Sequence, residues 1–435
     1  MSGVVEAVSV VDAYGSSVSL GKVREQILDG LARHVQLQVH TLGPRARRCS
    51  WSRISPSRPV FLLYVAHSLG RAAYLAPELL RGQIKVFVVG WELEELSADL
   101  LAELRGADAV VAISAFNADT YRRYLPQTPV FTVPLAPRSV DRPASQRGRF
   151  GLPEGPVCSL AMFDSVSGLD RKNPQDVITA FKRAFPNRED VRLVVKRHGH
   201  IAVPAAGIDR TGERARELDF FEECAVDPRI IVLNEFMVEK DVRTLMASCD
   251  VLVSLSRAEG FGLPVLEAMS MGIPVVCTGF SGHLDFATPE GALLVPYDRV
   301  PIGDSATEHY RPHHYDRPPS WAQPDLDCAA DYLRRLSDDE DFRRSRGLAA
   351  ASAAAAYRER CTRSTWVTDV LQSLQHPVVT SNHGQRTAEF RQVVAPQIVE
   401  WTAHERRVRL ARRRLRIRTL LGRVKRALPG VGGGG

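Results

Sequence analysis

Residues 251–278 read VLVSLSRAEGFGLPVLEAMSMGIPVVCT, and this stretch decides the fold. It begins with the apolar run VLVSLS, which is typical of a strand buried on both faces of a parallel sheet. A loop with two glycines follows, and Pro264 then opens a helix, since proline is favoured in the first turn. A second apolar run, IPVVCT, ends the unit. Strand, loop, helix and strand in this order predict an α/β fold with a parallel sheet.

The same alternation continues in both directions along the chain. Short apolar runs alternate with helical patterns after residue 155, and an equivalent series occupies the first 137 residues. A segment rich in proline, glycine, serine and charge separates the two series, as a linker does. We therefore predict two tandem Rossmann-like domains with a cleft between them. Ligands of such sheets bind at the carboxyl ends of the strands.

These patterns also place the boundaries of each part of the chain. We expect an N-terminal Rossmann-like domain at 1–137, a linker at 138–154, a C-terminal Rossmann-like domain at 155–362, a crossover helix at 363–376, a linker or helical extension at 377–403 and a basic amphipathic tail at 404–435.

The positive charge of the chain is concentrated in its tail. The chain has 57 Lys and Arg against 50 Asp and Glu, but residues 404–435 hold 11 of the former and one of the latter. The remainder therefore has 46 basic against 49 acidic residues, close to balance. Five apolar residues of the tail are spaced so that they would fall on one face of a helix: Leu410, Ile417, Leu421, Val424 and Leu428. A basic amphipathic helix favours an anionic membrane surface, while a partner helix, nucleic acid or a merely solubilising helix are alternatives.

Composition bounds the class of protein. With 44% hydrophobic and 25% charged residues the chain can form full cores, which excludes global disorder. No apolar run reaches the roughly 18 to 20 residues that a spanning helix needs, and no signal-peptide pattern opens the chain. We expect a cytoplasmic protein, and where the tail binds an anionic surface this would be the inner face of the cell membrane.

Two carboxylates flank the glycine loop of the deciding stretch. Glu259 lies in the loop, and Glu267 follows eight residues later inside the helix. Both can face the cleft, where a carboxylate accepts paired hydrogen bonds from neighbouring sugar hydroxyls. The free N–H groups near Gly262 and Leu263 would seat a diphosphate at the helix N-terminus. The alternatives are a Glu267 that only complements the helix dipole and a plain glycine turn.

Three cations should reach the same edge of the second sheet. Arg171 and Lys172 precede a helix that begins at Pro174, and Lys196 ends the strand VRLVVK. Together they can neutralise two phosphates. A solvated turn is the alternative for Arg171 and Lys172, whereas a buried Lys196 without an anion would be costly.

The N-terminal domain offers weaker candidates for ligand contacts on the opposite side of the cleft. GSSVSLGKV, residues 15–23, is a candidate glycine-containing loop with Gly21 facing the cleft, and Glu92 lies in the segment GWELE. His67 closes an apolar strand, where a structural histidine is the more common reading.

Residues 256–268 resemble the Glu-x7-Glu signature of retaining glycosyltransferase family 4, in the form Ser-Arg-x-Glu-Gly-Phe-Gly-Leu-Pro-x-x-Glu-Ala. DRKNPQDVITAF at 170–181, followed by the strand VRLVVK, resembles the mannosyltransferase-like branch of that family. The resemblance implies the GT-B fold, with an acceptor domain first and a donor domain second. It implies that Glu259 contacts hydroxyls of the donor sugar and that Glu267 holds the nucleotide ribose. Phe261, Gly262 and Leu263 would face sugar and phosphate.

The function expected from this resemblance is transfer of a hexose, such as mannose or glucose, from a nucleotide diphosphate sugar to a hydroxyl of a glycan or lipid-linked acceptor. The resemblance implies retention of the anomeric configuration. Glu259, Lys172 and Lys196 are the expected catalytic residues. We expect no metal and no cofactor, and we interpret the pair Asp325 and Asp327 as a helix N-cap. The rival functions are a nucleotide-sugar epimerase on the same fold and a non-catalytic scaffold that binds membrane or RNA.

Overall fold

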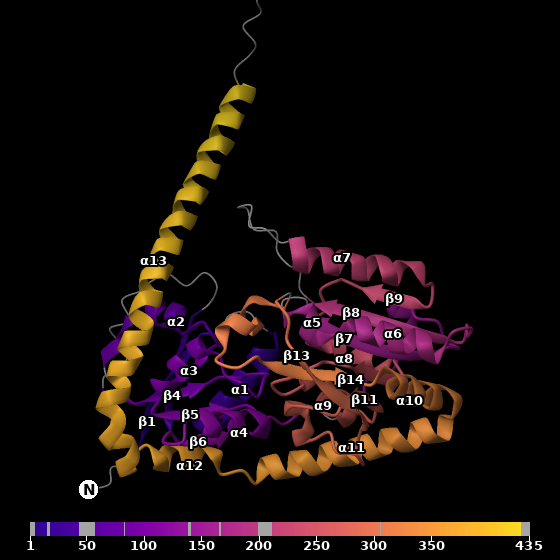
Figure 1. Ribbon diagram of the computed structural model, residues 1–435, viewed down its shortest axis with the longest axis horizontal. Helices are drawn as coiled ribbons and strands as arrows, with labels where there is room; N and C mark the ends of the chain where they lie inside the picture. The colour runs from indigo at the N-terminus through magenta and orange to yellow at the C-terminus, as the bar shows by residue number, and fades with distance from the viewer. Residues whose placement is uncertain are drawn as a thin grey trace, which may run out of the picture.

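The chain folds into two α/β domains, each built on a six-stranded parallel sheet (Figure 1). The structure is a computed structural model that describes residues 5–14, 18–42, 57–81, 83–137, 141–164, 167–198, 211–304 and 306–427. The strand order is β2-β1-β3-β4-β5-β6 in the first sheet and β12-β11-β10-β7-β8-β9 in the second. The predicted fold class is therefore confirmed.

The first domain alternates its strands with helices along the chain. Its strands are β1 (Ala7–Asp12), β2 (Gln36–Thr41), β3 (Val60–Leu63), β4 (Lys85–Val88), β5 (Ala109–Ala112) and β6 (Val130–Thr132). Its helices are α1 (Val18–Ala32), α2 (Leu69–Leu75), α3 (Ala98–Arg105) and α4 (Ala115–Tyr124). All residues of β3, β4 and β5 are buried, as in a sheet covered on both faces.

The second domain repeats this plan. Its strands are β7 (Val157–Asp164), β8 (Val191–His198), β9 (Ile230–Leu233), β10 (Val251–Ser254), β11 (Val275–Thr278) and β12 (Leu293–Val295). Its helices are α5 (Leu169–Lys172), α6 (Pro174–Ala184), α7 (Thr211–Val226), α8 (Glu239–Ala247), α9 (Leu263–Ser270), α10 (Leu326–Asp338) and α11 (Glu340–Thr362). The antiparallel hairpin of β13 (Tyr297–Pro301) and β14 (Ser320–Pro324) carries the segment between them toward the first domain.

The segment before β7 is docked on the second domain in its described part. Arg147 forms an ion pair with Asp250 at 2.6 Å, and Phe150 is buried. Residues 138–140 of the predicted linker lie outside the described residues. The two domains also touch directly, since Phe116 of α4 packs edge-on against Phe280 with ring centroids 5.4 Å apart.

Asp325 begins α10 as the sequence predicts of an N-cap. Its side chain accepts hydrogen bonds from the backbone N–H groups of Asp327 and Cys328, at 3.0 and 3.1 Å. The Asp-x-Asp pair is thus used to satisfy the free amides of a helix N-terminus.

The C-terminal part of the chain returns to the first domain. After α12 (Trp366–Ser373), the helix α13 (Pro377–Ala427) continues without interruption through the predicted extension and into the tail. Figure 1 shows its first half lying along the first domain and its second half standing clear of the body. Val379, Phe390 and Val394 of the first half are fully buried. One face of residues 377–394 therefore packs into the core of the first domain.

A buried charged cluster fixes this first half of α13. Asp108, immediately before β5, is fully buried and its carboxylate oxygens lie 3.0 Å from Nδ1 of His383. Arg386 donates to the backbone carbonyl oxygens of Asp108 and Gln127, at 3.1 and 2.7 Å.

Within the described residues, no helix is both long and apolar enough to cross a membrane.

Candidate functional site

The candidate site is built on the loop that joins β10 to α9. Gly262 precedes α9 with a φ of +88°, a left-handed conformation that glycine adopts without strain. A Cβ at this position would also lie 2.8 Å from Cβ of His283. The loop is pinned from the other side, because Gly282 N–H donates to the carbonyl oxygen of Glu259 at 2.9 Å. The glycines therefore set one rigid path for the backbone.

This path leaves backbone donors exposed at the start of α9. Among the described residues, no group accepts a hydrogen bond from the backbone N–H of Phe261, Gly262 or Leu263. Pro264 has no N–H to satisfy, and the first amides of a helix carry partial positive charge. The loop thus presents adjacent N–H groups that suit an anion.

Glu259 is held in this loop by two cations of the second domain. Lys172 Nζ donates to both of its carboxylate oxygens, at 2.6 and 2.9 Å, and Arg171 lies 3.5 Å away. Burial on its own would raise the pKa of Glu259, but Lys172 and Arg171 outweigh it and hold the pKa at about 2. Glu259 is therefore ionised throughout the physiological pH range.

Arg171 extends this cluster to the first domain. Its guanidinium is buried, donates to the carbonyl oxygen of Ala258 at 2.8 Å and lies 3.8 Å from the carboxylate of Glu92. Glu92 also accepts a hydrogen bond from the hydroxyl of Tyr310 at 2.9 Å. Glu92 of the first domain and Glu259 of the second therefore share one cation.

Glu267 contacts a different part of the first domain. Its Oε1 atom forms a hydrogen-bonded ion pair with Nζ of Lys22 from α1. The same ammonium lies 3.4 Å from Oε1 of Glu239, at the start of α8. The carboxylate of Glu267 thus faces the boundary between the two domains, as the sequence predicts for a residue of the cleft.

Lys196 lies at the end of β8, apart from the Glu259 cluster. Its buried ammonium donates to the backbone carbonyl oxygens of Arg197 and Glu235. Burial lowers its pKa. Within the described residues it forms no ion pair with Glu259 or Glu267. Carbonyl oxygens satisfy its hydrogen bonds without neutralising its charge, so the ammonium keeps an attraction for an anion.

His67 has a mainly structural setting. Its Nε2 atom lies 3.4 Å from Oγ of Ser97, and its ring packs near those of Trp91 and His309. Burial and the neighbouring His309 lower its pKa to about 4, so the ring is neutral at pH 7. It lies where the segment between β13 and β14 meets the first domain.

One local prediction in the first domain is wrong. Residues 15–23 were expected to form a loop, but α1 begins at Val18, so Gly21 lies inside a helix. Residues 15–17 are outside the described residues. The amphipathic pattern of the following helix extends back over Gly21, since one glycine costs a helix only about 1 kcal/mol. A Cβ at Gly21 would meet no atom within 4 Å, so the position borders open space.

Three residues of this arrangement are absent from the sequence predictions: Lys22, its second partner Glu239, and Tyr310. Lys22 joins Glu267, and Tyr310 joins Glu92, across sequence separations of 245 and 218 residues. Neither Lys22 nor Tyr310 belongs to a motif. The one signal near either of them was that Lys22 directly follows the predicted site residue Gly21 in the sequence.

His283, beside Gly262, also serves the backbone of this site. It is buried, with its Nε2 atom 2.6 Å from the carbonyl oxygen of Thr278. Because a carbonyl only accepts, Nε2 is the protonated nitrogen. Burial lowers its pKa, which keeps the ring neutral.

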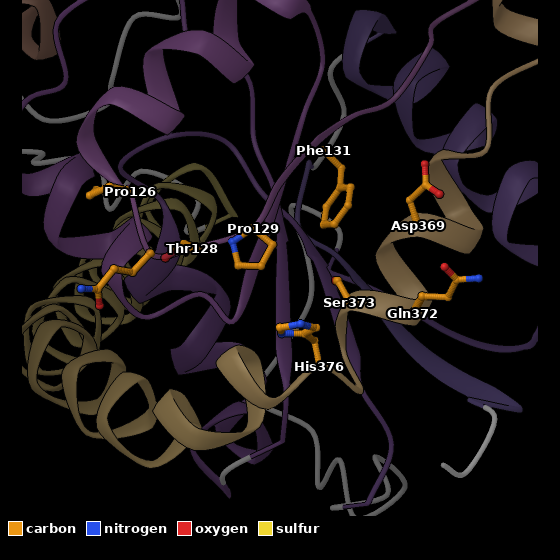
Figure 2. Close-up of a pocket in the computed structure, with 9 residues that line it drawn as sticks. Pro126, Thr128, Pro129, Phe131, Asp369, Gln372, Ser373 and His376 are labelled. Atoms are coloured by element: carbon orange, nitrogen blue, oxygen red, sulfur yellow. The ribbon is translucent and has the colours of Figure 1, made fainter.

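A separate hollow of about 550 Å³ lies between β6 and α12, on the first domain. Figure 2 shows Pro129 and Phe131 on one side of it and Asp369, Gln372 and Ser373 on the other. None of the predicted site residues lines it, and it has no lysine or arginine in its wall. It therefore lacks the positive charge that a diphosphate requires.

Comparison with known proteins bears on the Glu259 loop directly. Residues 165–299, which include this loop, match the family model described as glycosyl transferases group 1. The serotype-specific mannosyltransferase WbdA of Escherichia coli is 26% identical over an alignment 217 residues long that covers 47% of this chain. The chain spans only 24% of the length of that protein.

Solved structures share the two-domain architecture. Sucrose-phosphate synthase from Thermosynechococcus elongatus matches with a TM-score of 0.58 at 14% identity, covering 88% of this chain and 99% of that one. A trehalose-6-phosphate structure from E. coli, bound with UDP-2-fluoro glucose, matches with a TM-score of 0.57 at 10% identity, over 85% and 99% of the two chains. The fold is thus GT-B, and the family model and the relative support a glycosyltransferase of the GT-B type.

Proposed function

We propose that this chain is a retaining glycosyltransferase that moves a hexose from a nucleotide diphosphate sugar to a hydroxyl of a glycan or lipid-linked acceptor. The observation that carries this proposal is the loop from Glu259 to Leu263. It combines an ionised carboxylate, two paired cations and free backbone amides at one helix N-terminus. These are the groups that a sugar and a diphosphate need side by side.

The donor would lie along α9 in this proposal. Glu259 accepts hydrogen bonds from hydroxyls of the hexose, and the amides of Phe261 to Leu263 face the phosphates. Glu267, on the same helix, accepts from the hydroxyls of the ribose. Relatives differ in what their names give as the sugar, mannose for one and a glucose derivative for another, so both are candidate donors.

The charge of the departing diphosphate would be met by protein cations. Lys172 donates to both carboxylate oxygens of Glu259, and backbone carbonyl oxygens hold the amine of Lys196 at the end of β8. Stabilising a charge that grows in the transition state raises the rate of the chemical step. These cations and the helix N-terminus do this without a metal ion, and we propose that the transfer is metal-independent.

The acceptor would enter from the first domain. Glu92 shares Arg171 with Glu259, so it lies nearest to the reacting sugar among the acceptor candidates. His67 is neutral and Gly21 borders open space, and both are proposed only as walls of the acceptor path.

Thermal stabilisation by nucleotide sugars tests the proposal. We expect GDP-mannose, UDP-glucose or UDP-N-acetylglucosamine to raise the unfolding temperature of the chain. Glu267→Ala should then weaken binding of the selected donor about 10- to 100-fold, since it removes hydrogen bonds to a charged group. Titration calorimetry measures this loss.

A surface carboxylate provides the matched control. Glu223→Ala removes the partner of Lys182 on the outer surface of the second domain and should leave donor affinity unchanged. Equal affinities of the wild type and the Glu267 variant would remove Glu267 from the site. Donor turnover without any acceptor would favour the epimerase, and a chain that binds no nucleotide sugar would favour the scaffold.

We also propose that the tail holds the enzyme on the cytoplasmic face of an anionic membrane. Residues 404–427 continue α13 as a helix beyond the body of the protein (Figure 1). The sequence gives this part 11 cations and one apolar stripe. A lipid-linked acceptor would be found at that surface.

Truncation after His404 tests the role of the tail. The cut leaves Val379, Phe390 and Val394 in place, so the first domain should stay folded. We expect the shortened chain to lose sedimentation with anionic liposomes, because each apposed cation contributes up to ~1 kcal/mol. Transfer to a short soluble acceptor should persist.

The salt dependence of liposome binding and a test of RNA binding separate the membrane proposal from its alternatives. Binding of the full chain to liposomes should weaken as salt rises, because the attraction is screened. Equal sedimentation of both chains would refute the membrane proposal. Salt-sensitive binding to RNA alone would assign the tail to nucleic acid instead.

A further inference from the structure

Lys22 is the point where the first domain reaches the proposed ribose site. It lies on α1, and only 14% of its side chain is exposed. Its ammonium pairs with Glu267, which is 12% exposed, and lies 3.4 Å from Glu239. In the described part of the chain, no other cation lies within ion-pair distance of Glu267. One lysine of the first domain therefore serves two carboxylates of the second.

The setting of this pair differs from that of an ordinary surface pair. Lys182 and Glu223 are 2.8 Å apart, each about one-third exposed, and both belong to the second domain. Water screens such a pair, and holding its side chains gains little. Lys22 and Glu267 are largely withdrawn from water, so losing the lysine would leave a partly buried carboxylate without its counter-charge.

The pair also leaves the rest of the Glu267 carboxylate available. Lys22 contacts Oε1, and no described residue donates a hydrogen bond to Oε2. A carboxylate oxygen can accept two hydrogen bonds, so Oε2 can receive ribose hydroxyls while Oε1 stays with the lysine.

The contact exists only when α1 and α9 are close. These helices belong to different domains, so a domain motion that moves α1 away from α9 breaks the ion pair. Lys22 therefore orients the carboxylate of Glu267 only when the two domains are closed.

We propose that Lys22 is a positioning residue of the donor site. It orients the carboxylate of Glu267 so that this group can accept hydrogen bonds from the ribose hydroxyls. This orientation depends on closure of the two domains. The inference rests on the proposed donor site at Glu267. It adds a residue of the first domain to a site whose other parts lie in the second.

Three variants test it. Lys22→Met keeps the length of the side chain and removes the charge, Lys22→Arg keeps the charge, and Lys182→Met is the matched surface control. Calorimetry gives the dissociation constant for the nucleotide sugar selected by thermal screening, and steady-state kinetics give KM and kcat. We expect Lys22→Met to raise the dissociation constant and KM about tenfold and to change kcat by less than about threefold.

The two other variants, Lys22→Arg and Lys182→Met, are expected to bind the donor nearly as the wild type does. Lys22→Arg should recover most of the lost affinity, and Lys182→Met should match the wild type. A purely structural role of Lys22 would lower the unfolding temperature without a selective rise in KM. An unchanged dissociation constant, or a loss confined to kcat, overturns the proposal.

A double variant guards against a chain that merely fails to fold. Lys22→Met with Glu267→Gln leaves no unpaired carboxylate at position 267 and should unfold at a temperature close to that of the wild type. Its affinity should be no lower than that of Glu267→Gln alone, because Lys22 acts through Glu267. Additive losses would show that it acts elsewhere and overturn the proposal.

The two proposals fail in different ways. If the wild type binds a nucleotide sugar and Glu267→Ala weakens it, but Lys22→Met does not, only the role of Lys22 is refuted. If the wild type binds no nucleotide sugar, the proposed function is refuted and the role of Lys22 falls with it.

Discussion

Replacing Lys172 by methionine is expected to lower kcat about 10²- to 10³-fold, the range found when a single preorganised donor to a developing charge is removed. Lys172 donates to both oxygens of Glu259 and is the cation nearest to that carboxylate. In the proposed reaction it also faces the departing diphosphate, whose charge peaks in the transition state. Steady-state kinetics should therefore show a loss mainly in kcat, with a smaller change in KM.

The control must separate catalysis from folding. Without Lys172, Arg171 at 3.5 Å is the one cation within the described residues that still pairs with the buried carboxylate of Glu259, and breaking a buried pair from one side is destabilising. The double variant with Glu259→Gln removes that unpaired charge and should regain most of the unfolding temperature, while kcat stays low. A Lys172→Met enzyme with near wild-type kcat would exclude the lysine from the chemistry.

Replacing Phe390 by alanine is expected to lower the free energy of unfolding of the first domain by about 3–5 kcal/mol, as for other buried aromatic residues. Phe390 is fully buried, with its ring 6.1 Å from that of Phe87 and 4.9 Å from Nζ of Lys85. It also packs closely on Gly106, where a Cβ would lie 2.9 Å from its own. Urea denaturation, read at the transition of the first domain, measures the loss.

Val399 of the same helix provides the comparison. It is 67% exposed, so Val399→Ala should change stability by no more than about 0.5 kcal/mol. If both variants unfold alike, the first half of α13 is not part of the core. Truncation after residue 376 should then also be tolerated, whereas the buried contacts of α13 predict that this shorter chain does not fold.

The sequence predicted the fold because its signals are local. Strands such as Val251–Ser254 are continuous apolar runs, and Pro264 after a glycine marks the start of α9. Each depends on a few neighbouring residues, so the α/β order could be deduced along the chain. The helix at 377–403 was less clear, because Pro396 interrupts its pattern and only its buried contacts show what it does.

The same distinction holds for the candidate site. Glu259, Gly262 and Glu267 lie within eight residues of each other, on one loop and one helix, and a motif can identify them together. Arg171 and Lys172 follow from a turn before a helix. The structure brings these two cations to Glu259, but it places Lys196 on backbone carbonyls. Sequence spacing gave the edge of the sheet on which each cation lies, and side-chain packing gave its partner.

By itself, then, the sequence determined the parallel sheets, the glycine loop and the carboxylates of the second domain, since backbone propensity and helix geometry act over a few residues. Only the tertiary structure decided that Lys22 meets Glu267 and that Glu92 shares Arg171 with Glu259. These pairs join residues from opposite domains. Which residues pair across the domains depends on how the two complete domains pack. Such packing leaves no periodic pattern in the sequence of either segment.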